Sequence, residues 1–286
     1  MTTYGEGLDY NSLLDFLEHS PSNVIEGTYD RPSQIIVDDL GHIVHIESAG
    51  FGSDYISGLG YSWLNADAIT VLPGSAYIPA YNRIVDLLAP ITVPIPGTIN
   101  RLYYLYLQES SGAGSVFVSL TSPDAEYYGT ARTFPGDTSS RYIGCVKNDT
   151  AGRVIQFETE EFGNRVLVIY GEAQDSQTLM GWDGITATTT LQERSIGGLA
   201  PTQPEKMVPS SARTVNVALE KGGTAEVRVG WPLDQSFGIA PVLIPSGTSV
   251  LRPGILRLSP TQSLYYKTTS GTATLYLMVL SYYERR

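Results

Sequence analysis

Histidine is the side chain most often used for acid–base chemistry and zinc binding near neutral pH. All three histidines, His19, His42 and His45, lie within the first 47 residues. His42 and His45 are three residues apart on a predicted strand, so their side chains point to opposite faces and are not placed to share a metal ion. A Ser-His-Asp triad would need this segment to reach into another part of the chain, and there is no Gly-x-Ser-x-Gly motif. We predict surface histidines, no metal site and no cofactor.

Paired carboxylates are the residues of glycoside hydrolysis, which needs two carboxyl groups about 5–9.5 Å apart across a sugar cleft. Asp124 with Glu126 is one candidate pair, and Glu158, Glu160 and Glu161 form another group. Both groups lie at predicted turns or strand ends, where acidic residues are ordinarily solvated. The chain also lacks the many short repeats of a long β-helix. We therefore predict that the protein is not an enzyme and has no catalytic residue.

Three charged residues, Arg132, Asp137 and Arg141, lie close together in the sequence. We predict that they form ion pairs that clamp a loop to the following strand, with contact to a ligand as the alternative. Cys145 is the only cysteine, so an intrachain disulfide is impossible. Its place in the middle of a predicted strand favours a buried, unreactive thiol.

The composition indicates strands and turns rather than helices. The chain has 19 Tyr against 7 Phe, with 29 Gly and 17 Pro, and tyrosine is also common at protein interfaces. The net charge of −11 disfavours binding to nucleic acid or to anionic membranes. Residues 1–47 carry nine carboxylates and one arginine, whereas residues 206–286 carry four carboxylates and nine basic groups. This asymmetry favours ordered assembly of copies, or is ordinary surface charge.

Alternating apolar and polar residues between 69 and 157 predict a β-sheet module. Its most regular part is a hairpin of residues 101–107 and 115–120 around the glycine-bearing loop 110–114. A second hairpin is predicted from residues 141–146 and 153–157, and a further strand from 165–170. No segment approaches about 18 uninterrupted apolar residues, and the N-terminus lacks the basic and apolar regions of a signal peptide, so we expect no membrane insertion and no secretion signal.

The first 47 residues differ from the rest of the chain. A short helix is predicted over Leu13 to Glu18, and its apolar residues Leu13, Phe16 and Leu17 are too many for it to bury alone, so we assign them to an assembly contact. Residues 34–37 and 42–46 form a predicted hairpin. The segment is either an attachment arm or a peripheral layer on the first domain.

The C-terminal part predicts a second β domain. Residues 214–219 and 225–229 look like a hairpin around a Lys-Gly-Gly turn, and the last two strands, 263–267 and 272–283, meet at Ser270-Gly271. The final strand is apolar on both faces, so it is either central between two layers or buried against another subunit. We assign its Tyr276 and Met278 to an assembly contact.

Together these patterns predict a mainly β protein. It has two β-sandwich-like antiparallel domains, a short N-terminal helix and an attachment arm. We divide it into an arm at residues 1–49, a first β domain at 50–172, a linker or extended segment at 173–211, and a C-terminal β-sandwich domain at 212–286.

The run from Ala131 to Gly144, Ala-Arg-Thr-Phe-Pro-Gly-Asp-Thr-Ser-Ser-Arg-Tyr-Ile-Gly, follows the segments 69–79 and 102–107. This succession resembles a module of tail-fibre and related virion proteins of tailed bacteriophages, over roughly residues 65–160. The resemblance implies a structural virion protein, made in the host cytoplasm, that forms a homo-oligomer, with a trimer favoured. It implies contacts with other tail or capsid proteins of the phage. The remaining segments carry no motif of this family.

Three other functions stay open. The first is a carbohydrate-binding tip that recognises a glycan of the host surface through exposed aromatic residues, with Trp182, Trp231, Tyr127 and Tyr128 as receptor-contact candidates. The second is the hydrolase described above. The third is a head fibre or decoration protein on the capsid.

Overall fold

The computed structural model describes seven stretches of the chain, which are residues 32–37, 43–48, 54–171, 180–196, 207–230, 242–245 and 252–286. The chain divides into two compact units, Met1–Gly52 and Ser53–Arg286. The predicted helix with Leu13, Phe16 and Leu17 lies outside the described residues. In the first unit, strands β1 (Pro32–Val37) and β2 (Ile43–Ser48) pair antiparallel, which confirms the predicted hairpin.

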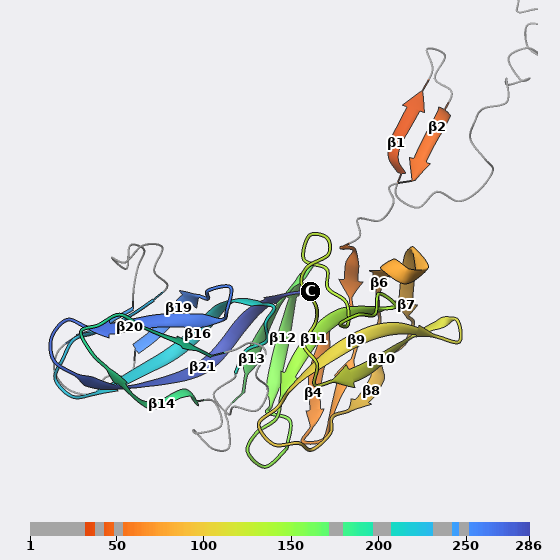
Figure 1. Ribbon diagram of the computed structural model, residues 1–286. Coiled ribbons are helices and arrows are strands. Elements are labelled where there is room, and N and C mark those ends of the chain that lie inside the picture. The colour runs from red at the N-terminus through yellow and green to blue at the C-terminus, as the bar shows by residue number, and fades with distance from the viewer. Residues whose placement is uncertain are drawn as a thin grey trace, which may run out of the picture. The chain divides into compact units, whose positions relative to one another are not determined.

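The second unit is mainly β, and its strands pair antiparallel in several sheets (Figure 1). Among the described residues the helical element is the short 3-10 turn η1 (Pro79–Tyr81), and no helix there is long and apolar enough to cross a membrane. The mainly β prediction is thus confirmed.

Three three-stranded sheets come from the first part of this unit. One is ordered β3-β6-β7, one β4-β5-β8 and one β10-β9-β11. Their bounds are β3 Ile56–Gly58, β4 Tyr61–Asn65, β5 Ala68–Val71, β6 Gly74–Ile78, β7 Arg83–Leu87, β8 Ile91–Pro94, β9 Leu102–Ser110, β10 Ala113–Ser119 and β11 Ser140–Lys147.

Two larger sheets complete the unit. A six-stranded sheet runs β12-β13-β21-β16-β19, with β14 also paired to β21, and a four-stranded sheet runs β15-β20-β17-β18. Their bounds are β12 Phe157–Phe162, β13 Arg165–Tyr170, β14 Met180–Ala187, β15 Gln192–Ser195, β16 Ala212–Gly222, β17 Val227–Gly230, β18 Val242–Ile244, β19 Arg252–Arg257, β20 Ser263–Thr268 and β21 Ala273–Arg285. The strands on either side of residue 172 therefore share one sheet.

The predicted β9–β10 hairpin is confirmed in full register from Ala113 opposite Ser110 to Ser119 opposite Tyr104. Its turn residues Ser111 and Gly112 both have positive φ, of 54° and 83°. Two such residues make the turn type whose twist matches that of the flanking strands, which is why the chain reverses there.

Two other predicted pairings are wrong. β11 pairs with β9 rather than with residues 153–157, which contribute an isolated bridge between Asn148 and Val154. β16 and β17 do not form a hairpin, because β16 pairs with β19 and β21 while β17 pairs with β18 and β20. β20 and β21 follow one another across Ser270-Gly271 but belong to different sheets. The predicted linker contributes β14 and β15, since both find partners in the C-terminal part of the chain.

The last strand, β21, changes its buried face along its length. Leu275, Leu277 and Val279 are buried, and the pairing with β16 then skips Leu280, which is a β-bulge. After the bulge the alternation changes phase: Ser281 and Tyr282 are both buried, Tyr283 is exposed, and Glu284 is buried. One extra residue inverts which side chains face inward. The part of β21 before Leu280 therefore buries one face of the strand, and the part after Leu280 buries the opposite face.

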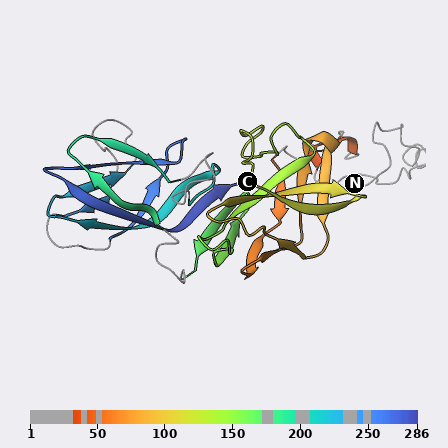
Figure 2. The same ribbon diagram turned by 60° about the horizontal axis from the view of Figure 1, so that its bottom comes forward.

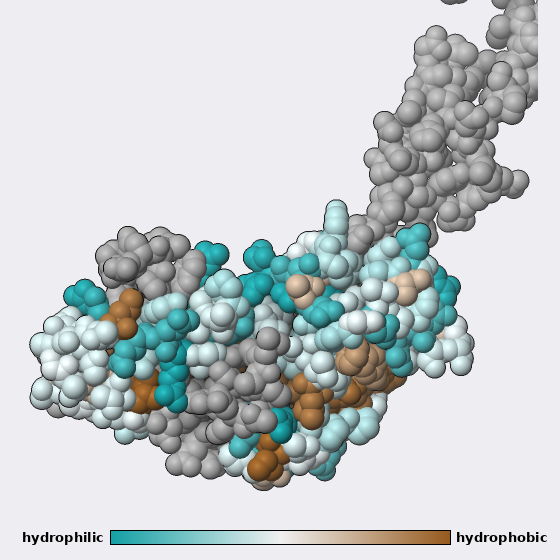
Figure 3. Space-filling view, in the orientation of Figure 1, coloured by the Kyte–Doolittle hydropathy of each residue, from teal (hydrophilic) through white to brown (hydrophobic). Residues whose placement is uncertain are grey.

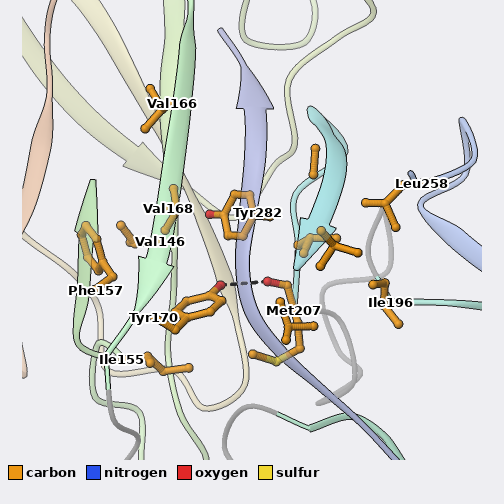
Figure 4. Packing of buried hydrophobic residues seen from close by; sticks show 14 of the residues in the cluster. Val146, Ile155, Phe157, Val166, Val168, Tyr170, Ile196, Met207, Leu258 and Tyr282 are labelled. Carbon is orange, nitrogen blue, oxygen red and sulfur yellow. Dashed lines mark hydrogen bonds between the residues drawn. The ribbon is translucent and has the colours of Figure 1, made fainter. Parts of the chain in front are cut away.

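The apolar cores of the two groups of sheets are continuous, since one cluster of buried residues runs from Ile56 to Tyr282. Figure 2 shows β21, in blue, running out of the C-terminal group of sheets toward the strands of the first part. Figure 4 shows Tyr170 of β13 next to Tyr282 of β21, with ring centroids 5.9 Å apart. The Tyr170 hydroxyl donates a 2.8 Å hydrogen bond to the Met207 carbonyl. We call this region, where β21 meets the strands of the first part of the unit, the junction.

Candidate functional site

The fully buried carboxylate of Glu284 is the centre of a polar cluster at the junction. It accepts hydrogen bonds from the Tyr61 hydroxyl at 2.6 Å, the Tyr142 hydroxyl at 2.7 Å and the Ser211 hydroxyl at 3.0 Å. Tyr61 comes from β4, Tyr142 from β11, and Ser211 directly precedes β16. One carboxylate therefore ties three segments from distant parts of the sequence to β21.

Burial raises the pKa of Glu284 above its ordinary value, while the three hydrogen bonds and the nearby Arg286 act in the opposite direction. Burial, followed by the Glu284 carboxylate, also raises the pKa of Tyr61 and of Tyr142 well above 10. The two phenols therefore stay protonated and act as donors. The cluster is a set of fixed donors around one acceptor.

Tyr61 fits its site with almost no free space. Its hydroxyl accepts a hydrogen bond from the backbone N–H of Cys145 at 3.3 Å, and its ring lies over Gly144, where an added Cβ would come within 2.2 Å of a ring carbon. Position 144 therefore needs glycine because a side chain there would displace Tyr61. Cys145 itself is buried, and burial raises the pKa of its thiol, as expected for an unreactive cysteine.

Arg286 makes a second set of contacts across the junction. Its buried guanidinium donates to the carbonyls of Leu59 at 2.9 Å and Gly58 at 3.0 Å, and to the Glu161 carboxylate at 2.8 Å. The Thr130 hydroxyl donates to the Arg286 carbonyl at 3.1 Å. Arg286 thus fastens the β3–β4 segment and strand β12 to the end of the chain.

Lys147, in β11, is a buried cation of a different kind. Its Nζ has no hydrogen-bond partner among the described residues. Burial lowers its pKa to about 8, and the nearby Arg101 acts in the same direction, while Cys145 opposes it. This side chain costs stability at neutral pH, because a charged ammonium is held away from water without a partner.

Tyr127 and Tyr128 are the receptor-contact candidates whose side chains the structure describes. They are 37% and 54% exposed. The buried Arg141 guanidinium donates to the Tyr127 hydroxyl at 3.2 Å and lies 5.9 Å from its ring centroid. The result is an exposed aromatic turn, Tyr127-Tyr128, fixed from beneath by a cation.

The ion pairs predicted among Arg132, Asp137 and Arg141 are not formed, and a different ion pair holds this loop. Arg132 pairs with Glu126 at 2.8 Å rather than with Asp137, and Glu126 also accepts from Arg213 at 3.1 Å. Asp137 instead accepts a hydrogen bond from the backbone N–H of Ser139 at 2.8 Å. The trio was expected to pair within itself because it is close in sequence, whereas the fold brings Glu126 nearer to Arg132.

The other predicted contact residues are only partly described. Tyr276 and Met278 of β21 are half-buried, and Met278 packs against the main core. Trp231 lies outside the described residues, and of Trp182, in β14, only the backbone is described. Of the candidate catalytic carboxylates, Glu126 and Glu161 are held in ion pairs. Within the described stretches no group of three or more His, Cys, Asp or Glu side chains is arranged to hold a metal ion.

Sequence reasoning missed Glu284, Arg286, Tyr61 and Lys147. A signal for two of them was present, because Tyr282, Glu284 and Arg286 alternate with period two directly after an apolar strand. The contacts themselves depend on residues more than 140 positions away, such as Tyr142 and Tyr61, and no local pattern encodes them. The chain matches no protein-family model, and no curated protein is found to match it.

Proposed function

We propose that this chain is a structural protein of a tailed-bacteriophage virion, located in the tail fibre or its base, where it assembles with copies of itself and with other virion proteins. It is made in the host cytoplasm and joins the particle. The chain is organised as two β-sandwich-like regions, preceded by an acidic arm and a short helix that provide attachment. The resemblance favours a trimer.

The proposal is carried by one observation: the buried polar groups connect strands to one another. Glu284 and Arg286 hold β4, β11, β12 and β21 to one another, and both side chains are fully buried. Buried groups of this kind are out of reach of a substrate, but they make the connection between the two regions stiff. Stiffness between sheets suits a protein that bears load in a particle. The segment 131–144, which is the most specific part of the resemblance, contributes Tyr142 to these contacts.

Electron microscopy tests the location. Gold-labelled antibodies raised against this protein are expected to bind intact tailed particles released by the producing bacterium, with the gold on the tail. Gold on the capsid would support the alternative of a head fibre or decoration protein. Particles that carry no label either intact or after disruption by detergent, in the same preparation where a major capsid antibody labels, would contradict the proposal.

A carbohydrate-binding role is a second candidate, supported by the exposed aromatic turn Tyr127-Tyr128. Sugars stack on exposed aromatic rings, and the Arg141 contact holds Tyr127 in place before any ligand arrives. On an array of bacterial surface glycans, Tyr128→Ala is expected to weaken saturable binding at least about tenfold, a loss of about 1.4 kcal/mol.

The matched control is Tyr283→Ala, which removes another exposed tyrosine, on β21, and should leave glycan binding unchanged. Equal binding by the wild type and Tyr128→Ala would exclude this turn as the site.

A further inference from the structure

The six-stranded sheet has one face turned away from the shared core. On β13 the buried Val166 and Val168 face that core, and Arg165 and Leu167 point to the other side. Residues that lie opposite one another on paired strands share a side of the sheet, so the strand registers identify the neighbours on β12, β21 and β19. We call this side the outer face, and its main residues are Phe162, Arg165, Leu167, Ile255, Tyr283 and Arg285.

Apolar side chains are concentrated on the outer face. Phe162 is 55% exposed, Ile255 is 73% exposed and Tyr283 is 38% exposed. They are three of the four large apolar side chains that the structure describes as exposed after residue 130. Leu167, between β12 and β21, is half-buried. A sheet face with this much exposed apolar surface is stabilised when another segment covers it.

Two arginines face one another on the same surface. Arg165 of β13 lies directly opposite Arg285 of β21, and like charges in this arrangement destabilise a sheet. Within the described residues neither guanidinium makes an ion pair or a side-chain hydrogen bond. The glutamates of this face, Glu158 and Glu160, lie on the edge strand β12 and do not pair with them. Carboxylates from another segment would remove the repulsion.

Charge distinguishes the outer face from other apolar surface of the unit. Figure 3 shows hydrophobic surface over β10 and the neighbouring end of β8. Neither of these strands carries a charged residue, so that surface does not discriminate between acidic and basic partners. The outer face does discriminate, because it combines apolar area with two unpaired arginines and therefore fits a segment that is both apolar and acidic.

The arm of this chain has both properties. Its predicted helix carries more apolar residues than it can bury alone. Asp15 and Glu18 are three residues apart, so they lie on one side of that predicted helix. The stretch 6–18 contains no Lys or Arg and four carboxylates, which are Glu6, Asp9, Asp15 and Glu18.

We propose that the acidic arm of one copy docks on the outer face of a neighbouring copy, with Asp15 and Glu18 at the arginine pair and the apolar residues of the arm over Phe162 and its neighbours. A net charge of −11 on each copy opposes contact between copies in general, whereas this contact brings unlike charges together. Each copy supplies one arm and one face, so the contact is head-to-tail. Such contacts close into rings, which agrees with the trimer that the resemblance implies.

This contact rests on the self-assembly in the proposed function and names the two surfaces that make it. The test is the mass of the full-length protein in solution, measured by light scattering. The wild type is expected to form particles of several copies, with three favoured. R165E/R285E and D15K/E18K each place like charges in the contact, so each is expected to give the 31.0 kDa of a single copy.

The variant that combines all four substitutions restores unlike charges with the signs exchanged, and its mass is expected to return to that of the wild type. An equimolar mixture of R165E/R285E and D15K/E18K is also expected to assemble, with a mass at least about twofold that of either variant alone. In the mixture each arm meets a face of opposite charge only on a copy of the other variant. Assembly there shows that the arm docks on a neighbour.

R83E/R153E is the matched control. It changes the net charge as much as R165E/R285E does, at two arginines that are 58% and 50% exposed and lie outside the outer face, and it should keep the wild-type mass. The core of the sheet lies on the side away from the outer face, so the face variants are expected to change the mass without changing the fold. Unchanged circular dichroism checks this.

The outcomes separate this contact from the proposed function. A wild type of several copies whose mass is unchanged in R165E/R285E overturns the docking on the outer face and leaves self-assembly standing. A D15K/E18K protein that keeps the wild-type mass, or a four-residue variant that stays a single copy, overturns the arm as the occupant. A wild type that is a single copy at all concentrations overturns self-assembly and the contact together.

Discussion

Glu284→Ala is expected to lower the free energy of unfolding by about 3–5 kcal/mol, the usual cost of removing one partner from a buried polar cluster. The truncation leaves the Tyr61, Tyr142 and Ser211 hydroxyls without their common acceptor inside the junction. Each buried donor that loses its partner costs about 1–3 kcal/mol. Urea unfolding followed by tryptophan fluorescence measures the change.

Glu160→Ala is the matched control, because Glu160 is an exposed carboxylate on β12. Its effect is expected to stay within about 0.5 kcal/mol. If the two variants unfold at the same urea concentration, the Glu284 cluster does not hold the junction together.

The pH dependence of the same site has a definite sign. The folded-state pKa of Glu284 is raised, so in the window above the ordinary value of 4.5 the native state holds a proton that the unfolded state has released. This contribution to stability is therefore largest at low pH and declines as the pH rises through that window. Glu284→Gln cannot titrate, so its stability relative to the wild type is expected to increase as the pH rises from about 4.5. A difference that is constant with pH would show that Glu284 does not titrate in this way.

Lys147→Met is expected to stabilise the protein by about 3 kcal/mol at pH 7, since a lysine pKa of about 8 in place of 10.5 corresponds to a destabilisation of that size. Methionine keeps most of the side-chain length and carries no charge. It removes an ammonium that has no hydrogen-bond partner among the described residues. Thermal and urea unfolding measure the gain.

The sign of the pH dependence follows from the lowered pKa. Between about pH 8 and 10.5 the folded protein releases the Lys147 proton while the unfolded chain retains it, so the wild type gains stability relative to Lys147→Met as the pH rises. Arg165→Met, at an exposed position on β13, serves as the control and should change stability by no more than about 0.5 kcal/mol. A Lys147→Met protein that is less stable than the wild type at pH 7 would show that the ammonium has a compensating contact.

The strands were easier to predict than their partners. Leu102–Leu107 and Arg165–Tyr170 mark strands because they are short runs of apolar, β-branched and aromatic residues, the kind that fill strands buried on both faces. Pairing depends on contacts far apart in sequence, and β16 shows the limit. Its turn-like Lys221-Gly222-Gly223 predicts a hairpin, but the strand pairs with β19 and β21, where its buried residues Val215 and Val217 reach the shared core.

The candidate site was predicted less well. Tyr127 and Tyr128 were identified because aromatic residues in a turn have nowhere local to be buried, and both are exposed. The Glu284 cluster could not be predicted, since a glutamate near the end of a strand is ordinarily solvated. Only the bulge at Leu280 turns it inward. A bulge has no reliable signature in one sequence, because it is set by the strands on either side.

The change of buried face within β21 has a mechanical meaning. A force on one group of sheets is transmitted to the other along the backbone of β21, because side chains of this strand are buried in both groups. The two groups therefore cannot slide or rotate past each other without shearing that backbone out of one of them. β21 therefore connects the two groups of sheets rigidly and does not act as a hinge between them.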